Sequence, residues 1–254
     1  MRSTSLLLAC ILLLSAGCGL LPEQVDETKD WSANELYTAA KERLDDQDYE
    51  KAIDYFEKLE ARYPFGSYAQ QAQLEIAYAY YKFDEPDSCI STADRFIRNN
   101  PGNPHIDYAY YLKGLANYTR GQELADRLAS RDPSDRDTRA LRDAFNDFTQ
   151  LVKKFPDSRY TPDATQRLIF LHNMLAKYEI NVAEYYMKRG AYVAAADRAK
   201  YVIENYQRTP AAQDALKVLV RAYTKMGMKD LSNDARRILE LNTAPAQQPE
   251  TTEP

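Results

Sequence analysis

The chain has 254 residues, of which 44% are hydrophobic and 28% charged, which argues against wholesale disorder and against a multi-span membrane protein. Only 8 residues are Gly, so the sequence also disfavours sheet-and-hairpin folds, whose turns need Gly. The formal net charge of −5 disfavours general nucleic-acid binding, and the 3 Cys and 2 His residues show no metal-site spacing.

Residues 1–17 are predicted to be a signal peptide. Arg2 supplies a short basic region, and residues 6–14 form an apolar run that is shorter than the roughly 20 residues needed to span a bilayer. A buried N-terminal helix is the alternative interpretation of this run. The signal-peptide pattern favours removal of these residues, so we exclude them from the fold.

Residues 15–18 (SAGC) resemble a bacterial lipobox, although Ser15 stands where an aliphatic residue is usual. The resemblance implies that the thiol of Cys18 receives a lipid and that the signal peptide is cut just before it. Cys10 is the competing lipid site, but it lies within the apolar run. Because Gly19 is not an Asp, the resemblance to bacterial sorting rules implies transfer to the outer membrane.

Residues 18–31 are predicted to be a flexible tether, because they are polar and show little periodicity. Such a tether would let the folded body stand off the membrane. After cleavage only Cys18 and Cys89 remain, and acylation of Cys18 leaves no partner for an intrachain disulfide. Cys89 is therefore expected to be a small core residue.

From residue 32 onward, apolar residues recur at helical spacing, and one unit repeats. The first copy has a small residue, an aromatic residue, an apolar residue and a closing proline, namely Ala52, Phe56, Leu59 and Pro64. The matching sets are Cys89, Ala93, Phe96 and Pro101; Ala144, Phe148, Leu151 and Pro156; Ala195, Ala199, Val202 and the late Pro210; and the weaker Leu231, Ala235 and Ile238. A helix-turn-helix unit of about 34 residues explains the spacings if two repeats carry extra segments.

This pattern resembles the tetratricopeptide repeat. Small residues let the two helices of such a repeat cross closely, and Ala40, Ala77 and Gly114 occupy the matching position in three first helices. The sequence therefore predicts an all-α superhelical solenoid of about five helix-turn-helix repeats. Residues 32–160 would form an N-terminal half with repeats 1–3, and residues 161–242 a C-terminal half with repeats 4–5. The alternative is a generic helical bundle with chance periodicity.

Three segments depart from the repeat. Residues 119–140 are dense in charge and include Asp132-Pro133, so much of this insertion is predicted to be an exposed loop, with room for one short helix. Residues 163–189 keep helical periodicity and are predicted to form one helix of about 27 residues, about 40 Å long, that joins the two halves rigidly. Residues 243–254 lack apolar periodicity and are predicted to be a disordered tail.

The charge is distributed unevenly between the halves. Residues 161–242 carry 13 Lys and Arg against 9 Asp and Glu, a net charge of +4, whereas residues 1–160 carry a net charge of −7. Solvated helix faces would account for this difference without any function. Alternatively, the basic half docks an acidic partner, and the opposite potentials steer the encounter.

No set of residues points to catalysis. His172 falls in the long predicted helix and His105 in a loop, so we expect packing or structural roles for both. The chain has no Gly-rich phosphate loop. Asp45 and Asp46 fall in a polar turn, which lacks the apolar surroundings that raise a carboxyl pKa for acid catalysis. We therefore expect no enzyme activity, no cofactor and no metal.

Binding is better supported than catalysis. Residues 78–81 and 108–111 place tyrosines in the first helices of repeats 2 and 3, and first helices line the concave face of such solenoids. Tyrosine offers a large contact area and a hydrogen-bonding end, which suits peptide recognition. The alternative is that these tyrosines pack between repeats.

Longer segments resemble one family within this repeat class. They are residues 62–66 (RYPFG), 70–82 (QQAQLEIAYAYYK), 94–98 (DRFIR) and 164–190, the last containing LAKYE and VAEYY. These segments resemble the BamD family, the tetratricopeptide lipoproteins of the outer-membrane β-barrel assembly machinery. The resemblance covers about residues 15–242 and implies a scaffold of five repeats, lipid-anchored on the periplasmic face of the outer membrane.

The resemblance also implies binding residues. The N-terminal half of this family is associated with recognising the C-terminal strand of unfolded barrel substrates, and Tyr63 and Arg95 lie in the matching segments. The C-terminal half docks the periplasmic domain of the barrel-forming subunit, and Arg198 matches a family arginine at that contact. Accessory lipoproteins of the machinery are further expected partners. The alternatives are a helix-end packing role for Tyr63 and ordinary surface ion pairs for the two arginines.

Two other functions remain open on the sequence. Another tetratricopeptide lipoprotein scaffold, such as a pilotin for secretin assembly, would share Cys18 and the repeats but not the RYPFG and LAKYE…VAEYY segments. A periplasmic enzyme with a repeat domain would need a catalytic domain, and the length of the chain leaves no room for one.

Overall fold

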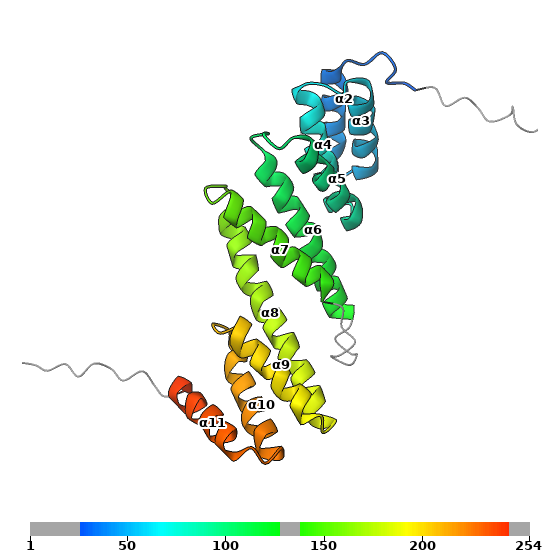
Figure 1. Cartoon of the computed structure of the whole chain (residues 1–254). Coiled ribbons are helices and arrows are strands. Elements are labelled where there is room, and N and C mark those ends of the chain that lie inside the picture. Colours follow the sequence, from blue (N-terminus) through cyan, green and yellow to red (C-terminus); the bar gives the residue numbers. More distant parts are fainter. Residues whose placement is uncertain (1–25, 128–137, 244–254) are drawn as a thin grey trace, which may run out of the picture.

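A computed structural model describes residues 26–127 and 138–243 (Figure 1). All regular structure within these residues is helical, and the helices are α2 (Ala33–Asp45), α3 (Tyr49–Arg62), α4 (Ser67–Lys82), α5 (Pro86–Asn99), α6 (Ile106–Arg127), α7 (Arg139–Lys154), α8 (Thr161–Lys188), α9 (Tyr192–Asn205), α10 (Ala211–Lys225) and α11 (Lys229–Thr243). The predicted signal peptide, the lipid site Cys18 and residues 244–254 of the predicted tail lie outside the described residues.

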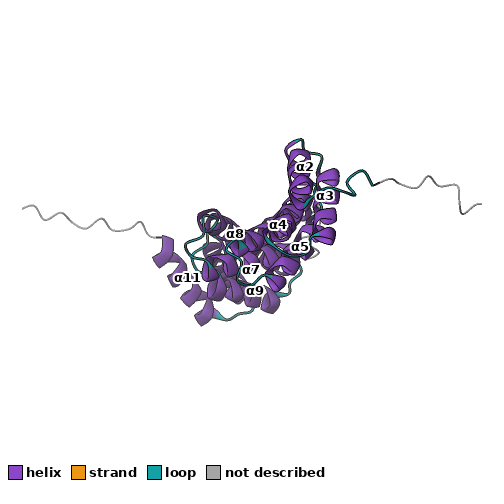
Figure 2. Ribbon diagram, turned by 90° about the horizontal axis from the view of Figure 1, so that it is seen from above, coloured by secondary structure: helices purple, strands orange, loops and turns teal. Residues whose placement is uncertain are grey.

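Consecutive helices pack against each other along the described chain and form five pairs, from α2/α3 to α10/α11. First helices also contact the first helix of the next pair, α2 with α4, α4 with α6 and α8 with α10. The pairs follow one another in an elongated stack (Figure 1), and the view from above shows that the stack curves (Figure 2). The prediction of an all-α solenoid of five helix-turn-helix repeats is therefore confirmed.

Local sequence explains where the helices begin and end. Ser32 caps α2 in a capping box with Glu35, because the Ser32 hydroxyl accepts from the Glu35 N–H at 3.3 Å while the Glu35 carboxylate accepts from the Ser32 N–H at 2.7 Å. α3 ends just before Pro64, since proline cannot continue a helix. Pro86 and Pro162 lie in the first turns of α5 and α8, where the missing N–H is tolerated.

The recurring positions of the repeat form the core. The residues that are 0% exposed include Ala52, Phe56, Leu59, Cys89, Ala93, Phe96, Ala144, Phe148, Leu151, Ala195, Ala199 and Val202. At Gly114 an added Cβ would lie 2.6 Å from Cε1 of Phe148, so α6 crosses α7 at a distance that excludes a side chain. Ala40 and Ala77, at the matching position of the first two repeats, are also 0% exposed. The predicted close crossing is therefore confirmed at Gly114, and the burial of Ala40 and Ala77 agrees with the same role.

Helix α8, with 28 residues, is the longest helix in the described part of the chain. The prediction of a long helix over 163–189 is confirmed. α8 contacts α7 before it and both α9 and α10 after it. Larger side chains connect it to α6, because the Tyr111 hydroxyl donates to Asp163 at 2.8 Å and the ring of Tyr118 lies 6.0 Å from that of Phe170. α8 therefore joins the first three helix pairs to the last two.

Over residues 119–140, where the sequence predicts a loop with one short helix, residues 119–127 continue helix α6, and residues 128–137 lie outside the described residues. α6 continues to Arg127, and α7 begins at Arg139. Residues 122–127 (QELADR) contain good helix formers, and the first proline after them is Pro133, so nothing in that stretch ends the helix.

The structure also differs from the prediction of a flexible tether over residues 18–31. Residues 26–31 pack onto α3, and Thr28 is only 2% exposed. Arg62 donates to the Thr28 carbonyl oxygen and to the Asp26 carboxylate, and Lys58 Nζ lies 3.8 Å from Asp26 Oδ1. The polar composition of the segment suggested a tether, because contacts to residues more than thirty positions away leave no trace in local composition.

Candidate interaction sites

Tyr63 lies at the C-terminal end of α3 and is 37% exposed. Its hydroxyl donates to the carbonyl oxygen of Trp31 at 2.9 Å. Arg62 beside it holds the same N-terminal segment through Asp26 and Thr28. The first two residues of the RYPFG segment therefore fix residues 26–31 on the first repeat. These contacts favour the packing alternative for Tyr63, and its role in substrate binding stays a prediction.

Phe65 is 91% exposed and lies in the turn between α3 and α4. The next residue, Gly66, has a φ of 104°, in the left-handed region that favours glycine, and it precedes the first residue of α4. In the sequence, Phe65 stands out only as part of the RYPFG family segment. Its position two residues after Tyr63 adds an apolar side chain to the surface at the end of the first repeat.

Arg95 lies on α5, and its side chain is 45% exposed. Its Nη2 donates to Oε2 of Glu60 at 3.2 Å, and Gln73 on α4 donates to the other oxygen of Glu60 at 2.8 Å. Glu60 lies on α3, three residues before Tyr63 in the sequence, so Arg95 pairs with the last turn of the helix that Tyr63 ends. The ion pair itself is of the exposed kind that contributes little to stability.

Arg198 lies on α9, and its side chain is 45% exposed. Its Nη1 donates to Oε2 of Glu179 on α8 at 2.9 Å. On the other side, Nη2 of Arg142 on α7 donates to Oε1 of the same carboxylate at 3.1 Å. Glu179 is only 1% exposed, and a buried carboxylate is tolerated when it is paired and hydrogen-bonded. Three consecutive helices from two repeats thus meet at one carboxylate.

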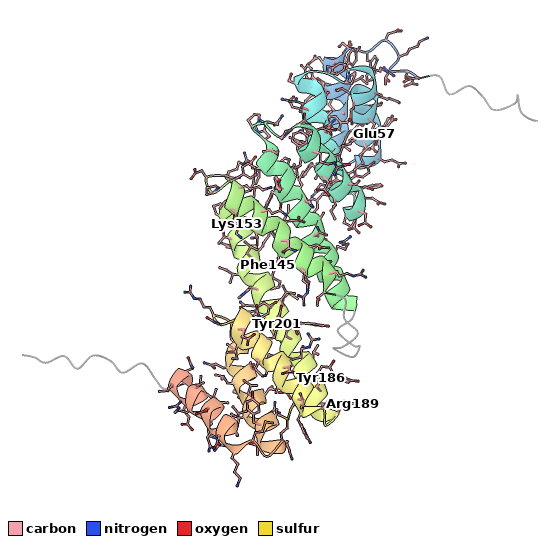
Figure 3. All side chains as sticks on the ribbon, in the orientation of Figure 1. Glu57, Phe145, Lys153, Tyr186, Arg189 and Tyr201 are labelled. Atoms are coloured by element: carbon pink, nitrogen blue, oxygen red, sulfur yellow. The ribbon has the colours of Figure 1, made fainter. Side chains whose placement is uncertain are left out.

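A hollow of about 290 Å³ lies beside this carboxylate, between α7 and α9 and over α8. Its walls include Phe145 on α7 and Tyr201 on α9 (Figure 3). The imidazole of His172 packs with its ring centroid 6.0 Å from that of Phe145 and 4.8 Å from that of Tyr206. His172 is therefore a packing residue, as expected, and Arg142 also lines the hollow.

The tyrosines of the two predicted recognition segments take part in packing. Tyr108 and Tyr111 stack on Tyr160, with centroids 5.2 and 4.7 Å apart. Burial raises the pKa of Tyr111 to about 12, so the hydroxyl stays protonated at neutral pH. Tyr80 packs against the core and donates at 3.2 Å to Glu57 on α3. Glu57 is labelled in Figure 3. These contacts favour the packing alternative over a peptide-binding face.

The remaining groups offer little reactive chemistry. Burial raises the pKa of the Cys89 thiol to about 12, so Cys89 is not a thiolate at neutral pH. Within residues 26–127 and 138–243, no group of three or more His, Cys, Asp and Glu side chains is arranged to hold a metal ion. Over the same ranges, every helix is too short or too polar to cross a membrane.

Glu179 and Arg142 are not among the functional residues predicted from the sequence. A signal for Glu179 was present, because it stands four residues after Leu175 and four before Ala183, which are both buried. An acidic residue on the apolar stripe of a helix requires a hydrogen-bonded or cationic partner. No such signal marked Arg142. Its contact with Glu179, which is 37 residues away in the sequence, depends on how α7 crosses α8.

A protein-family model described as an outer membrane lipoprotein, YfiO, matches residues 29–238. The matched range begins in the segment that packs onto α3 and ends within α11. It therefore reaches into all five helix pairs and includes the three residues predicted to bind substrate or partner.

The chain is also similar to several curated proteins named outer membrane protein assembly factor BamD. It is 45% identical over 224 residues to the one from Neisseria meningitidis serogroup B (strain ATCC BAA-335 / MC58), which covers 88% of this chain and 84% of that protein. It is 41% identical over 207 residues to the one from Xylella fastidiosa (strain 9a5c), covering 82% and 71%. It is 34% identical over 241 residues to the one from Vibrio cholerae serotype O1 (strain ATCC 39315 / El Tor Inaba N16961), covering 95% and 98%.

Proposed function

Because this chain belongs to the BamD family of outer membrane protein assembly factors, we propose that it is a binding scaffold without turnover. Its N-terminal half, residues 32–160, would bind unfolded outer-membrane substrates. Its C-terminal half, residues 161–242, would dock the periplasmic domain of the barrel-forming subunit of the assembly machinery. The family membership replaces the alternative of a secretin pilotin, which would share only the lipoprotein signal and the repeats.

Docking by the C-terminal half is carried by one observation, the partly exposed guanidinium of Arg198 on a basic half of the molecule. Its side chain is 45% exposed, and one nitrogen is held by Glu179. The fork of an arginine can present two further N–H groups to a carboxylate of a partner. The net charge of +4 over residues 161–242 favours the approach of an acidic surface.

Substrate binding is proposed for the surface around Tyr63, Phe65 and Arg95. The aromatic side chains supply apolar contact, and Arg95 supplies a cation that is only singly paired, with Glu60. An extended peptide with an aromatic residue and a terminal carboxylate has the complementary chemistry. The surface around Arg95 would bind substrate, and the surface around Arg198 would bind the barrel-forming subunit. Because the two surfaces lie in different halves, the scaffold could hold both at once.

Lipid attachment at Cys18 is proposed for anchoring to the periplasmic face of the outer membrane. Residues 26–31 pack onto α3, so only the chain between Cys18 and Asp26 separates the lipid from the first repeat. A chain of this length reaches roughly 25–30 Å at most. The N-terminal half would therefore be held close to the membrane. Accessory lipoproteins of the machinery would be further partners.

Affinity purification of the tagged, full-length protein from mildly solubilised outer membranes, followed by mass spectrometry, tests this function. We expect a large barrel protein with periplasmic repeat domains to be recovered in near-equal amount. The variant Arg198→Glu should lose most of that protein. Arg221→Glu is the matched control, because Arg221 is an exposed arginine of the same half that pairs with Glu184 on α8.

Two results would contradict the proposal. Recovery of a secretin or of cell-wall proteins without the barrel protein would refute the scaffold function. Equal recovery of the barrel protein by the wild type and by Arg198→Glu would leave the scaffold function intact and refute docking through Arg198.

A further inference from the structure

We propose that Glu179 is a positioning residue, which holds one edge of the Arg198 guanidinium so that the other edge faces a partner's carboxylate. This inference rests on the proposed docking through Arg198. It adds that Glu179 orients the Arg198 side chain before the partner binds. Glu179 itself is 1% exposed and cannot contact a partner directly.

The geometry divides the Glu179 carboxylate between two cations. Oε2 accepts from Nη1 of Arg198 at 2.9 Å, and Oε1 accepts from Nη2 of Arg142 at 3.1 Å. Arginine prefers to face a carboxylate with two parallel hydrogen bonds. Because Arg142 occupies Oε1, Arg198 makes a single bond to Oε2, and the rest of its guanidinium stays turned away from Glu179.

Holding Arg198 in advance lowers the entropic cost of docking. A long arginine side chain on a helix surface loses rotamer freedom when it pairs with a partner. In this structure the contact with a buried carboxylate already restricts the side chain, although it is 45% exposed. Arg142 contributes on the other side, because it keeps Glu179 paired and prevents Arg198 from turning its whole fork inward.

A double-mutant cycle with the purified periplasmic domain of the same organism's barrel-forming subunit tests the proposal. We expect Glu179→Gln to weaken binding of the full-length protein to this domain about 3- to 10-fold. In the background of Arg198→Ala, Glu179→Gln should cause no further weakening, since there is no arginine left to position. The matched control is Glu184→Gln, which removes the same charge from α8 but leaves Arg198 held, because Glu184 pairs with Arg221.

A second variant covers the case in which Glu179→Gln does not fold. Arg142→Gln leaves Glu179 paired with Arg198, so no buried charge is left without a cation. Because it releases Oε1, Arg198 can turn both nitrogens inward, and binding to the same domain should weaken about 3- to 10-fold as well. NMR measures how freely the Arg198 guanidinium rotates. It should rotate more freely in Glu179→Gln than in the wild type, and as slowly as in the wild type in Glu184→Gln.

The outcomes distinguish failure of the positioning role of Glu179 from failure of docking through Arg198. Equal weakening by Glu179→Gln with and without Arg198 would show that Glu179 acts on the shape of the repeats, and would overturn the positioning role. Unchanged or tighter binding in Glu179→Gln, with Arg198→Ala still weak, would overturn it too and leave docking through Arg198 in place. Unchanged binding in Arg198→Ala would overturn the docking itself.

Discussion

Two buried carboxylates in this molecule are neutralised in different ways. Asp147 on α7 is 4% exposed, and its partners are Lys113 at 3.2 Å and Asn117 at 2.7 Å, both on α6. Both partners lie on the helix that pairs with α7, although Lys113 also pairs with Asp94 on α5 at 2.9 Å. Glu179 on α8 is 1% exposed, and its partners, Arg142 and Arg198, come from α7 and α9, the helices before and after its own.

The two carboxylates differ in which helices must be in place before their direct partners can reach them. The direct partners of Asp147 are in place once α6 and α7 have paired, and Lys113 links them further to Asp94 of the second repeat. The surroundings of Glu179 are complete only when α7, α8 and α9 are all in place, and α8 is the helix that joins the third repeat to the fourth. A carboxylate of the second kind therefore contributes to the relation between the halves as well as to stability.

The largest expected effect is loss of both cations from Glu179. Arg142→Ala combined with Arg198→Ala should lower the free energy of unfolding by about 3–5 kcal/mol, because it leaves a buried carboxylate without a partner. Each single variant should lose much less, since one arginine remains. Urea unfolding followed by circular dichroism measures all three.

The control for this prediction is Asn117→Ala, which removes one direct partner of Asp147 and leaves the pairs of Lys113 with Asp94 and Asp147 in place. This variant should also destabilise the fold but leave the solution shape of the folded protein, measured by small-angle X-ray scattering, unchanged. The Arg142/Arg198 double variant should change that shape. If its loss of stability equals the sum of the two single losses, the arginines act independently and do not share one carboxylate.

Features within a helix pair could be predicted from the sequence, whereas contacts between stacked repeats could not. The helix pairs and their small and aromatic core residues were predictable, because a 34-residue unit buries the same positions each time and Phe56, Phe96 and Phe148 recur with it. Contacts that depend on how repeats are stacked were not predictable. Arg142 and Glu179 are far apart in the sequence, and only the crossing of α7 over α8 brings them together.

The candidate binding residues show the same limit. Tyr63, Arg95 and Arg198 came from family segments, and the sequence did not reveal that each has a partner within the chain. Those partners are Trp31, Glu60 and Glu179. The local pattern gives the residue types that a surface can offer, whereas pairing across helices decides which side of a guanidinium is available.

A smaller effect is expected at the crossing of α6 and α7, which belongs to the interior of one repeat. Gly114→Ala should destabilise the protein by about 1–3 kcal/mol, because the new methyl would meet Cε1 and Cδ1 of Phe148 at 2.6 and 2.7 Å. A gain of about 1 kcal/mol in helix propensity opposes this loss. Thermal and urea unfolding of the variant measure the net effect.

The matching positions of the first two repeats provide the control for Gly114. Ala40→Gly and Ala77→Gly should each cost about 1 kcal/mol, since alanine is already accommodated there and glycine only weakens the helix. Phe148→Leu should rescue part of the loss in Gly114→Ala. A stabilising Gly114→Ala would show that Phe148 moves aside readily, and that the crossing does not require a glycine.

The smallest expected effect is a pH dependence that arises from Asp147. Burial, which outweighs the attraction of Lys113 and the hydrogen bond of Asn117, raises the pKa of the Asp147 carboxyl. The folded state therefore binds this proton more tightly than the unfolded state does. As the pH falls through the raised pKa towards the unfolded value of about 3.9, Asp147 should favour folding more and more.

The stability of the wild type minus that of Asp147→Asn should accordingly become more positive as the pH falls from 7 to 4. Asp163→Asn is the opposite case, because the pKa of Asp163 is lowered: burial raises it, but the hydrogen bonds from Arg167 and Tyr111 prevail. The corresponding difference for Asp163 should therefore become less positive as the pH falls. Urea unfolding at several pH values measures both. If the difference for Asp147 also became less positive as the pH falls, its pair with Lys113 would outweigh burial, and the sign expected for this carboxyl would be wrong.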